Sequence, residues 1–501
     1  MGTLKFPTPA MQELSGLVWQ CGHDNFSSSH IRILIRQNGD VIEQALREVM
    51  QPDLVGVSIS DRFSIIDSAK SLVTRKISAE RLSNRMGVHA NLTIMHSGNE
   101  LLLKYLMSHR GSMICTFVMS SEGEVWTYII KEAFTPEQPD RVDYALCQVV
   151  TKEDAPEFMA AFRQYLESLT SGRVDFDTQT YLLHKIGSTI VPLIAQLGLA
   201  NRIVLIPHRL LHSIPLHAMF IQNESKVIYI NDLVASITYA SSLHESYMLG
   251  HHGGIIKMEF DKEGKIIERP FELASNANRL LAVLDTECSE LAWVRFESQY
   301  YEMLKKQGIP LDIVQSRSQI PDDLKPYLLI HWSGHGKSDP VNWGGSSLTF
   351  SGKTYQTLNI AKDWSLSARL VTLGACETAL HMFDQDFSDE YCGLDLAFRL
   401  AGATNVYATM WPIHDHTAAI ASQMLNASFM LGGGTPSQAL GGMQYGFRKG
   451  TWKRILRKEP SPTLDRSLQD EYHEQIKRLH SLDDDVFADP RHWAVFRCFG
   501  P

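Results

Sequence analysis

The pattern of apolar and polar positions divides the chain near Ser112. Before that point, apolar residues recur at helical spacing in AMQELSGLVWQ, VIEQALREVM, SIIDSAKSLVTRK and ELLLKYLMSH, and the polar segments SSS and QPD interrupt them. This spacing predicts short amphipathic helices. We therefore expect a helical region over residues 1–111 that acts as an adaptor, as a self-association module or as a cap on the rest of the chain.

From Ser112 onward, apolar runs of strand length alternate with helical stretches. MICTFVM and VWTYII flank SSEGE, which predicts a β-hairpin. A long helical stretch follows to about Leu199, and RIVLIPHRLLHSIPLHAM then predicts a strand and a turn. Residues 250–278 are polar, contain glycines and interrupt this order, so we expect an inserted loop or hairpin there. Residues 112–278 are the second predicted region.

Residues 279–501 have the most regular order and are the third predicted region. RLLAVLD predicts its first strand, and a helix near 291–306 followed by a strand at 311–314 completes a βαβ unit. Further helices are expected in LDLAFRLAGA, at 417–429, at 436–448 and at 462–480, and further strands in NVYATMW and the closing DPRHWAVFRCFG. This order predicts an α/β fold in which helices cover a sheet.

Composition and charge narrow the possible functions. A chain of 501 residues exceeds one typical core, and its 44% hydrophobic residues supply apolar surface for two or three domains. The net charge is −9, with 56 acidic against 47 basic residues, which argues against direct nucleic-acid binding because phosphate backbones require a basic field. No apolar run reaches the roughly 18 residues of a spanning helix, so we expect no membrane span.

The cysteines bear on the cellular compartment. There are 7 of them, scattered without C-x-x-C spacing, and an odd number does not fit a disulfide framework. The N-terminus also lacks the charged and then apolar build of a signal peptide. We therefore expect a reducing, cytoplasmic location, in which a thiol stays available for chemistry.

Two apolar runs of the third region end on reactive side chains. LLIHWSGHG ends near His335, and RLVTLGACET contains Cys376 directly after its apolar run. Because neighbouring parallel strands present their carboxyl ends at one edge of a sheet, an imidazole would lie beside a thiol nucleophile there. The glycines of both motifs leave room for a substrate backbone, and the amides of Gly336 and Cys376 are candidates for an oxyanion hole. The other cysteines lack such a neighbourhood, and Cys392 and Cys498 are expected to be structural.

A strand that ends in HG, followed by a strand that ends in L-x-A-C-x-T, resembles the CHAT proteases. These belong to the clan of caspases, separases and gingipains. The segment I-P-x-x-x-L-H-x-x-P and the closing DPRHWAVFRCFG add to a resemblance that covers about residues 112–501 and is densest from 279 onward. It implies a caspase-hemoglobinase-like sheet flanked by helices, preceded by an N-terminal β-hairpin or pseudo-caspase-like subdomain.

The resemblance also implies an activity. It points to a regulated, zymogen-like cysteine endopeptidase, without cofactor, that cuts partner proteins after a sensor or adaptor releases it, commonly in bacterial defence or cell death. The sensor or adaptor would contact residues 1–111. Cys376 would be the nucleophile and His335 the acid/base group.

Substrate recognition is expected from loops near these two residues. Trp411 and Asp415 match the family's W-x-V-x-D pattern after the fifth core strand, where Trp411 would wall a pocket and Asp415 would contact substrate. Asp386, in the acidic loop DQDFSDEYCG, would supply charge. Gly374 stands where metacaspases and paracaspases carry an aspartate, which counts against a strict preference for Arg or Lys through that residue.

Three alternatives stay open. An inactive CHAT scaffold that only binds partners would keep the same motifs. A nucleotide enzyme would use GGSSLTFSGKT, but Ser347 replaces a glycine of the phosphate-loop pattern and SSLTFSG alternates as a strand does. A metal site at His331, or at His414, Asp415 and His416, lacks a separated third ligand, so no metal is expected. His331 would point to the same side of its strand as His335 and either orient it or pack.

Overall fold

The structure is a computed structural model of the whole chain. The residues it describes are 8–22, 28–51, 54, 57–70, 111–132, 142–198, 200–223, 226–243, 245–246, 256–260, 266–270, 278–288, 291, 293–315, 319–339, 345–379, 391, 393–432, 435–454 and 466–501. The chain forms two compact units, which are described separately below. The first contains Met1–Met248 and His381–Cys392 together with Pro501, and the second contains Leu249–Leu380 and Gly393–Gly500.

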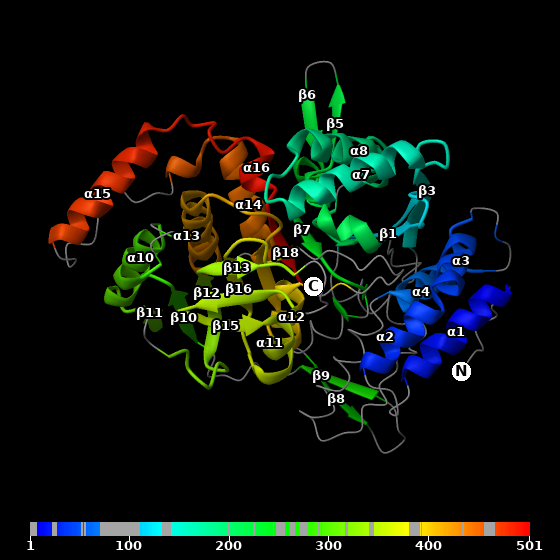
Figure 1. Cartoon of the computed structure of the whole chain (residues 1–501), viewed down its shortest axis with the longest axis horizontal. Helices are drawn as coiled ribbons and strands as arrows, with labels where there is room; N and C mark the ends of the chain where they lie inside the picture. The colour runs from blue at the N-terminus through cyan, green and yellow to red at the C-terminus, as the bar shows by residue number, and fades with distance from the viewer. Residues whose placement is uncertain are drawn as a thin grey trace. The chain divides into compact units, whose positions relative to one another are not determined.

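The first unit is built around five neighbouring strands in the order β7-β4-β1-β2-β3. Of these, β7, β1 and β3 are labelled in Figure 1. Their bounds are β1 Ser112–Met119, β2 Val125–Glu132, β3 Val142–Val150, β4 Arg202–Ile206 and β7 Ser236–Tyr239. The predicted hairpin is confirmed, because β1 pairs with β2 in antiparallel register. Strand β4 pairs in parallel with both β1 and β7, so this sheet is mixed.

Strand β3 lies inside the stretch that the sequence pattern assigns to a helix, so that assignment was wrong. The strand is amphipathic and partly exposed, with Tyr144 48% exposed. Among the described strands it pairs with β2 alone, at the edge of the sheet. Such an edge strand depends on its neighbour for its hydrogen bonds, which local spacing does not reveal. The helical prediction holds afterwards, for α7 Ala155–Thr170 and α8 Phe176–Leu197.

The N-terminal helices belong to the same unit. They are α1 Pro9–Gly22, α2 Ser28–Gln37, α3 Gly39–Val49 and α4 Ile59–Ala69. Two of the predicted stretches are confirmed in α1 and α3, and SIIDSAKSLVTRK is confirmed only in its first part, because α4 ends at Ala69. Its last six residues and ELLLKYLMSH lie outside the described residues. Helix α2 was not predicted, because it begins in the SSS segment taken as a break. Ser58 caps α4 by accepting a hydrogen bond from the Asp61 amide, at 3.1 Å.

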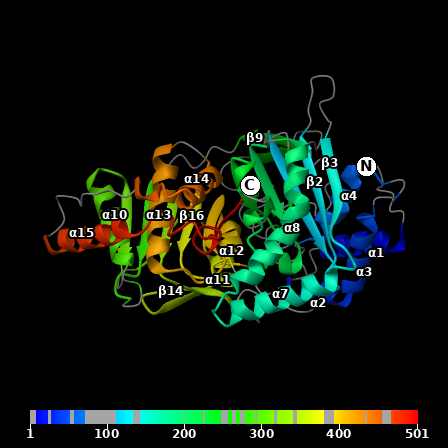
Figure 2. The same cartoon turned by 90° about the horizontal axis from the view of Figure 1, so that it is seen from above.

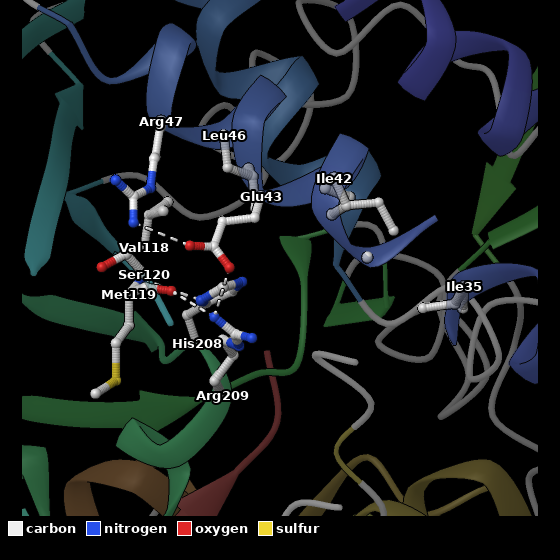
Figure 3. A pocket seen from close by; sticks show the side chains of 12 residues that line it. Ile35, Ile42, Glu43, Leu46, Arg47, Val118, Met119, Ser120, His208 and Arg209 are labelled. Atoms are coloured by element: carbon white, nitrogen blue, oxygen red, sulfur yellow. Dashed lines mark hydrogen bonds and ion pairs between the residues drawn. The ribbon is translucent and has the colours of Figure 1, made fainter. Parts of the chain in front are cut away.

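A charged cluster joins α3 to the strands of its unit (Figure 3). Glu43 accepts from Arg47 at 3.1 Å and from Arg209 at 3.3 Å, and the Ser121 amide donates to it at 3.0 Å. Burial raises the pKa of Glu43, but the Ser121 hydrogen bonds and the two arginines outweigh it, so the pKa is lowered. Glu43 is therefore held as a carboxylate between α3, the β1–β2 hairpin and the segment after β4.

The second unit contains six neighbouring strands in the order β11-β10-β12-β16-β17-β18. Their bounds are β10 Arg279–Leu284, β11 Leu311–Gln315, β12 Tyr327–Ser333, β16 Leu370–Gly374, β17 Asn405–Thr409 and β18 Phe496–Phe499. All these neighbours pair in parallel except β17 and β18, which are antiparallel. The predicted βαβ unit and the strands around it are confirmed, except that the closing DPRHWAVFRCFG is a strand only over Phe496–Phe499 and its first part forms a short helix, α16 Pro490–Trp493.

Helices cover both faces of this sheet (Figure 2). Their bounds are α10 Val294–Lys306, α11 Thr357–Asp363, α12 Leu394–Ala401, α13 Asp415–Gly432 and α14 Pro436–Arg448. Helix α10 packs beside α13, and α11 packs beside α12. Right-handed crossovers place helices on both faces of a sheet when the chain reverses its direction across the strands. Here the chain moves across the sheet in one direction from β10 to β11, and in the opposite direction from β12 through β16 to β17. The order of the strands therefore reverses between β10 and β12.

Smaller elements complete both units. The helices are η1 Arg209–Ser213, η2 Leu216–Ala218, η3 Ile230–Asp232, η4 Trp452–Arg454, α15 Arg466–Ser481 and α16 Pro490–Trp493. The strands are β5 Phe220–Asn223, β6 Lys226–Tyr229, β8 Ile256–Phe260, β9 Ile266–Pro270, β13 His335–Lys337, β14 Ser347–Phe350 and β15 Lys353–Gln356. The hairpin predicted in 250–278 is confirmed by the antiparallel pair β8 and β9.

The segment GGSSLTFSGKT forms a hairpin and not a phosphate loop. Strands β14 and β15 pair in antiparallel register around a turn at Ser351 and Gly352, whose φ angles are +50° and +75°. Lys353 and Thr354 thus lie on a strand, whereas a phosphate loop leads from a strand into the N-terminus of a helix. The hairpin is continued by β13, which begins at His335.

The core of the second unit contains a buried ion pair. Arg497 on β18 donates to Asp395 on α12 from Nε at 3.1 Å and from Nη2 at 2.8 Å, and both side chains are 0% exposed. Such a pair is tolerated in a core only because each charge neutralises the other. Among the helices of the described segments, none is both long and apolar enough to cross a membrane.

Candidate active site

The structure brings the His335 and Cys376 motifs together at one edge of the sheet. Strands β12 and β16 are parallel neighbours, with Ser333 paired to Gly374. His335 and Cys376 each follow two residues later, and both are half-buried. A Cβ atom on Gly336 would lie 2.4 Å from the Cys376 carbonyl oxygen, so only a glycine fits there without displacing the Cys376 backbone. The two motifs are in direct backbone contact.

Hydrogen bonds fix the turn that carries Cys376. The Thr409 amide of β17 donates to Thr378 Oγ1 at 2.8 Å, and the Thr409 hydroxyl donates to the Ala375 carbonyl. Glu377 has a φ of +55°, a backbone conformation that is costly for a residue with a side chain. Its carboxylate accepts from the amide and the hydroxyl of Ser338, at 3.2 and 3.1 Å, which ties the turn to the end of β13.

The surroundings of Cys376 favour the thiol over the thiolate. Burial raises its pKa most, and the negative charges of Glu377 and Asp415 raise it further. A hydrogen bond from the Ile413 backbone opposes these effects but does not outweigh them. The thiol therefore needs a base, or a change of its surroundings, before it becomes a nucleophile near neutral pH.

His335 contacts a thiol that sequence reasoning missed, that of Cys288. Cys288 Sγ lies 3.0 Å from His335 Nε2. The prediction that the other cysteines lack an imidazole neighbour was therefore wrong for Cys288. Cys288 follows β10, the strand beside β12, so the rule for the carboxyl ends of parallel strands could have identified it. Cys498 is buried with 0% exposure, and Cys392 lies outside the described residues.

A buried polar network lies behind His335. His331 is 0% exposed, and its Nδ1 is 2.7 Å from the Thr372 hydroxyl of β16. Its Nε2 is 3.3 Å from Glu297 on α10, and the Ser333 hydroxyl also donates to this carboxylate. The ring stacks on Tyr301, with 5.1 Å between centroids. Because β12 ends at Ser333, His331 and His335 lie on different strands, so the prediction that both project from one strand was wrong.

The predicted substrate-binding residues have different surroundings. Asp415 begins α13 and accepts from the Trp293 amide at 2.6 Å. Burial raises the pKa of Asp415 to about 6, which the Trp293 hydrogen bond opposes and the charge of Glu297 assists. Trp411 is only 1% exposed, and its indole donates to the Arg491 carbonyl at 3.3 Å. Asp386 lies outside the described residues.

The histidines near Asp415 pack against one another. His414 stacks on His416, with ring centroids 5.5 Å apart, and His492 lies 6.1 Å from His414. Burial, with the charges of the other two rings, lowers the pKa of His416 to about 4. Within the described ranges, no group of three or more His, Cys, Asp or Glu side chains is arranged to hold a metal ion.

These features define an α/β protein of the caspase-like class, with His and Cys motifs at the carboxyl ends of adjacent parallel strands. The CHAT domain family matches residues 181–501, and the chain belongs to this family. No curated protein matches it.

A solved structure shares this fold. A chain of a crystal structure of the Saccharomyces cerevisiae separase–securin complex is similar, with a TM-score of 0.55 and 11% sequence identity. A second crystal structure of that complex gives a TM-score of 0.48 and 10% identity. In both, the similarity covers 98% of this chain and 40% of the other, so this chain spans 40% of the length of the chain it matches.

Proposed function

We propose that this protein is a cysteine endopeptidase that cleaves partner proteins with Cys376 as nucleophile and His335 as acid/base group. The observation that carries the proposal is the direct contact between the two motifs, where Gly336 packs against the Cys376 carbonyl at the carboxyl ends of β12 and β16. Membership of the CHAT domain family agrees with this chemistry. A role in bacterial defence or cell death belongs to the same proposal and rests on the family resemblance. A cytoplasmic location also belongs to it, and rests on the scattered cysteines, which do not fit a disulfide framework.

The proposed reaction has two halves. His335 takes the proton of the Cys376 thiol, and the thiolate attacks the scissile carbonyl carbon to form a C–S bond. The amides of Gly336 and Cys376 stabilise the oxyanion, and His335 returns its proton to the departing amine as the C–N bond breaks. Water then attacks the thioester and gives a proton to His335. The C–S bond breaks, and that proton restores the thiol.

Substrate recognition is proposed for the segment after β17. Asp415 is close enough to Cys376 for its charge to raise the pKa of the thiol, so a basic substrate side chain beside Asp415 would remove that unfavourable interaction. Asp386 would add negative charge. Trp411 would form part of the buried wall of the pocket, since its side chain is buried.

Regulation by a partner protein is part of the proposal. The raised pKa of Cys376 suits an enzyme that rests in a latent form. Residues 1–111 would bind the sensor or adaptor that activates it. In the similar solved structure, a separase is in complex with securin, which supports the idea of a partner protein for this chain.

The test is intact-protein mass spectrometry after incubation with a mixture of peptidyl acyloxymethyl ketones. We expect one adduct per chain, loss of that adduct in Cys376→Ala, and labelling slower by about 100-fold or more in His335→Ala, the usual contribution of an acid/base group. Cys147→Ala is the matched control, because it removes another half-buried thiol and should label normally. An undiminished adduct in Cys376→Ala would refute the proposed nucleophile.

A catalytically inactive CHAT scaffold is the second candidate. It is favoured by the carboxylates of Glu377 and Asp415, which oppose formation of a thiolate at Cys376. Under this alternative, no variant would form an adduct, although the chain would still bind its protein partners.

A further inference from the structure

Cys288 lies where the order of the strands reverses, between β10 and β12. In open α/β sheets, ligands bind at the carboxyl ends of the strands beside such a reversal. The turn that carries Cys288 is fixed by two backbone hydrogen bonds of 3.2 Å each, from the Cys288 amide to the Asp285 carbonyl and from the Leu291 amide to the Cys288 carbonyl. Its half-buried thiol lies 3.0 Å from His335 Nε2. This contact is within hydrogen-bonding distance for sulfur and nitrogen.

The thiols of Cys288 and Cys376 thus differ in their interactions with the imidazole of His335. His335 Nε2 is hydrogen-bonded to Cys288 Sγ. By contrast, the groups that set the pKa of the Cys376 thiol are the Ile413 backbone, Glu377 and Asp415, together with burial. A ring nitrogen of imidazole makes one hydrogen bond at a time in its plane, so Nε2 cannot serve both thiols at once.

We propose that Cys288 is a positioning residue that holds the imidazole of His335 in the resting enzyme and competes with Cys376 for it. This inference rests on the proposed function of Cys376 and His335. The turn that carries Cys288 has a second connection to the site. It leads into Trp293, whose amide donates to Asp415 at 2.6 Å.

The experiment follows the rate at which iodoacetamide alkylates Cys376, measured by peptide mass spectrometry from pH 6 to pH 9.5. Iodoacetamide is small and needs no substrate pocket, so it reports the state of the thiol. The proteins are the full-length wild type, Cys288→Ala, Cys288→Ser, His335→Ala and the double variant Cys288→Ala/His335→Ala. Cys115 and Cys498 are 0% exposed and serve as internal controls, since they stay unlabelled only in folded protein.

We expect Cys288→Ala to raise the rate at Cys376 by about fivefold at pH 7, the change that one hydrogen bond of ordinary strength produces. The pH profile should move to lower pH, because the released imidazole accepts the Cys376 proton. Cys288→Ser keeps a hydroxyl that can bind the imidazole, and should restore most of the slow rate. In the double variant Cys288→Ala/His335→Ala, the increase in the alkylation rate at Cys376 should be lost, because no imidazole is left to accept the proton. If Cys288 had a merely structural role, Cys288→Ala would not shift the pH profile of alkylation at Cys376, and Cys288→Ser would not restore the slow rate.

Two other results would refute different parts of the reasoning and can be told apart. If removal of Cys288 leaves the rate at Cys376 unchanged or lowers it, while that rate still depends on His335, the competition is refuted and the proposed function stands. If the rate at Cys376 does not depend on His335 in either background, the proposed pair of Cys376 and His335 is itself wrong.

Discussion

Loss of the buried charge of Asp395 should strongly destabilise the second unit. In Asp395→Asn the side chain keeps its size but loses its negative charge, so the buried guanidinium of Arg497 loses the charge of Asp395. Both side chains are 0% exposed and are joined by two hydrogen bonds, at 3.1 and 2.8 Å. Breaking a fully buried pair by removing one charge costs about 3–5 kcal/mol. We therefore expect the free energy of unfolding to fall by about 3–5 kcal/mol.

The assay is urea unfolding at pH 7, followed by circular dichroism, with an exposed pair as matched control. Asp312 forms an ion pair with Arg279, but these side chains are 32% and 47% exposed. Asp312→Asn should cost less than about 1 kcal/mol, the usual value of a solvent-exposed pair. The double variant Asp395→Leu/Arg497→Met should recover most of the loss, because an apolar pair of similar volume carries no desolvation penalty.

The result that would contradict this reasoning is equality of the two single variants. If Asp395→Asn costs no more than Asp312→Asn, Arg497 finds another partner or water when Asp395 is neutral. The pair would then not explain how α12 is held against β18.

The remaining predictions concern the site and the helical region. The folded-state pKa of Asp415, about 6, lies above its ordinary value of 3.8, so stability should fall as the pH rises from about 3.8 to about 6. Asp415→Asn should flatten that slope in urea titrations at several pH values. Gly336→Ala places a Cβ 2.4 Å from the Cys376 carbonyl and should abolish acyloxymethyl ketone labelling. Gly442→Ala on α14 meets nothing within 4 Å and should label normally while stabilising the chain by up to about 1 kcal/mol. Glu43→Gln weakens the ion pairs of α3 and should speed amide hydrogen exchange in α3, whereas a rate equal to that of the wild type would show that these pairs contribute little.

Much of the second unit could be predicted from the sequence, because its strands are continuous apolar runs and its helices are amphipathic. Runs such as LLAVL and LVTL allow few structures other than buried strands. The sites of His335 and Cys376 follow from the same pattern, since glycines end both strands and leave a reactive side chain at the carboxyl edge. Strand β3 and helix α2 could not be predicted in this way. One is an edge strand that needs its neighbour, and the other starts in a serine segment that equally suits a turn.

The sequence by itself determined which residues carry reactive groups and where most strands of the second unit lie, because side-chain chemistry and hydrophobic period are local properties. Only the tertiary structure decided which of these groups meet. Cys288 and His335 are 47 residues apart, yet the pairing of β10 with β12 places thiol and imidazole in contact. The same holds for Glu297 and His331, which form a buried pair because α10 packs against the strands. Strand order and helix packing set such distances, and neither is encoded in the residues immediately around a motif.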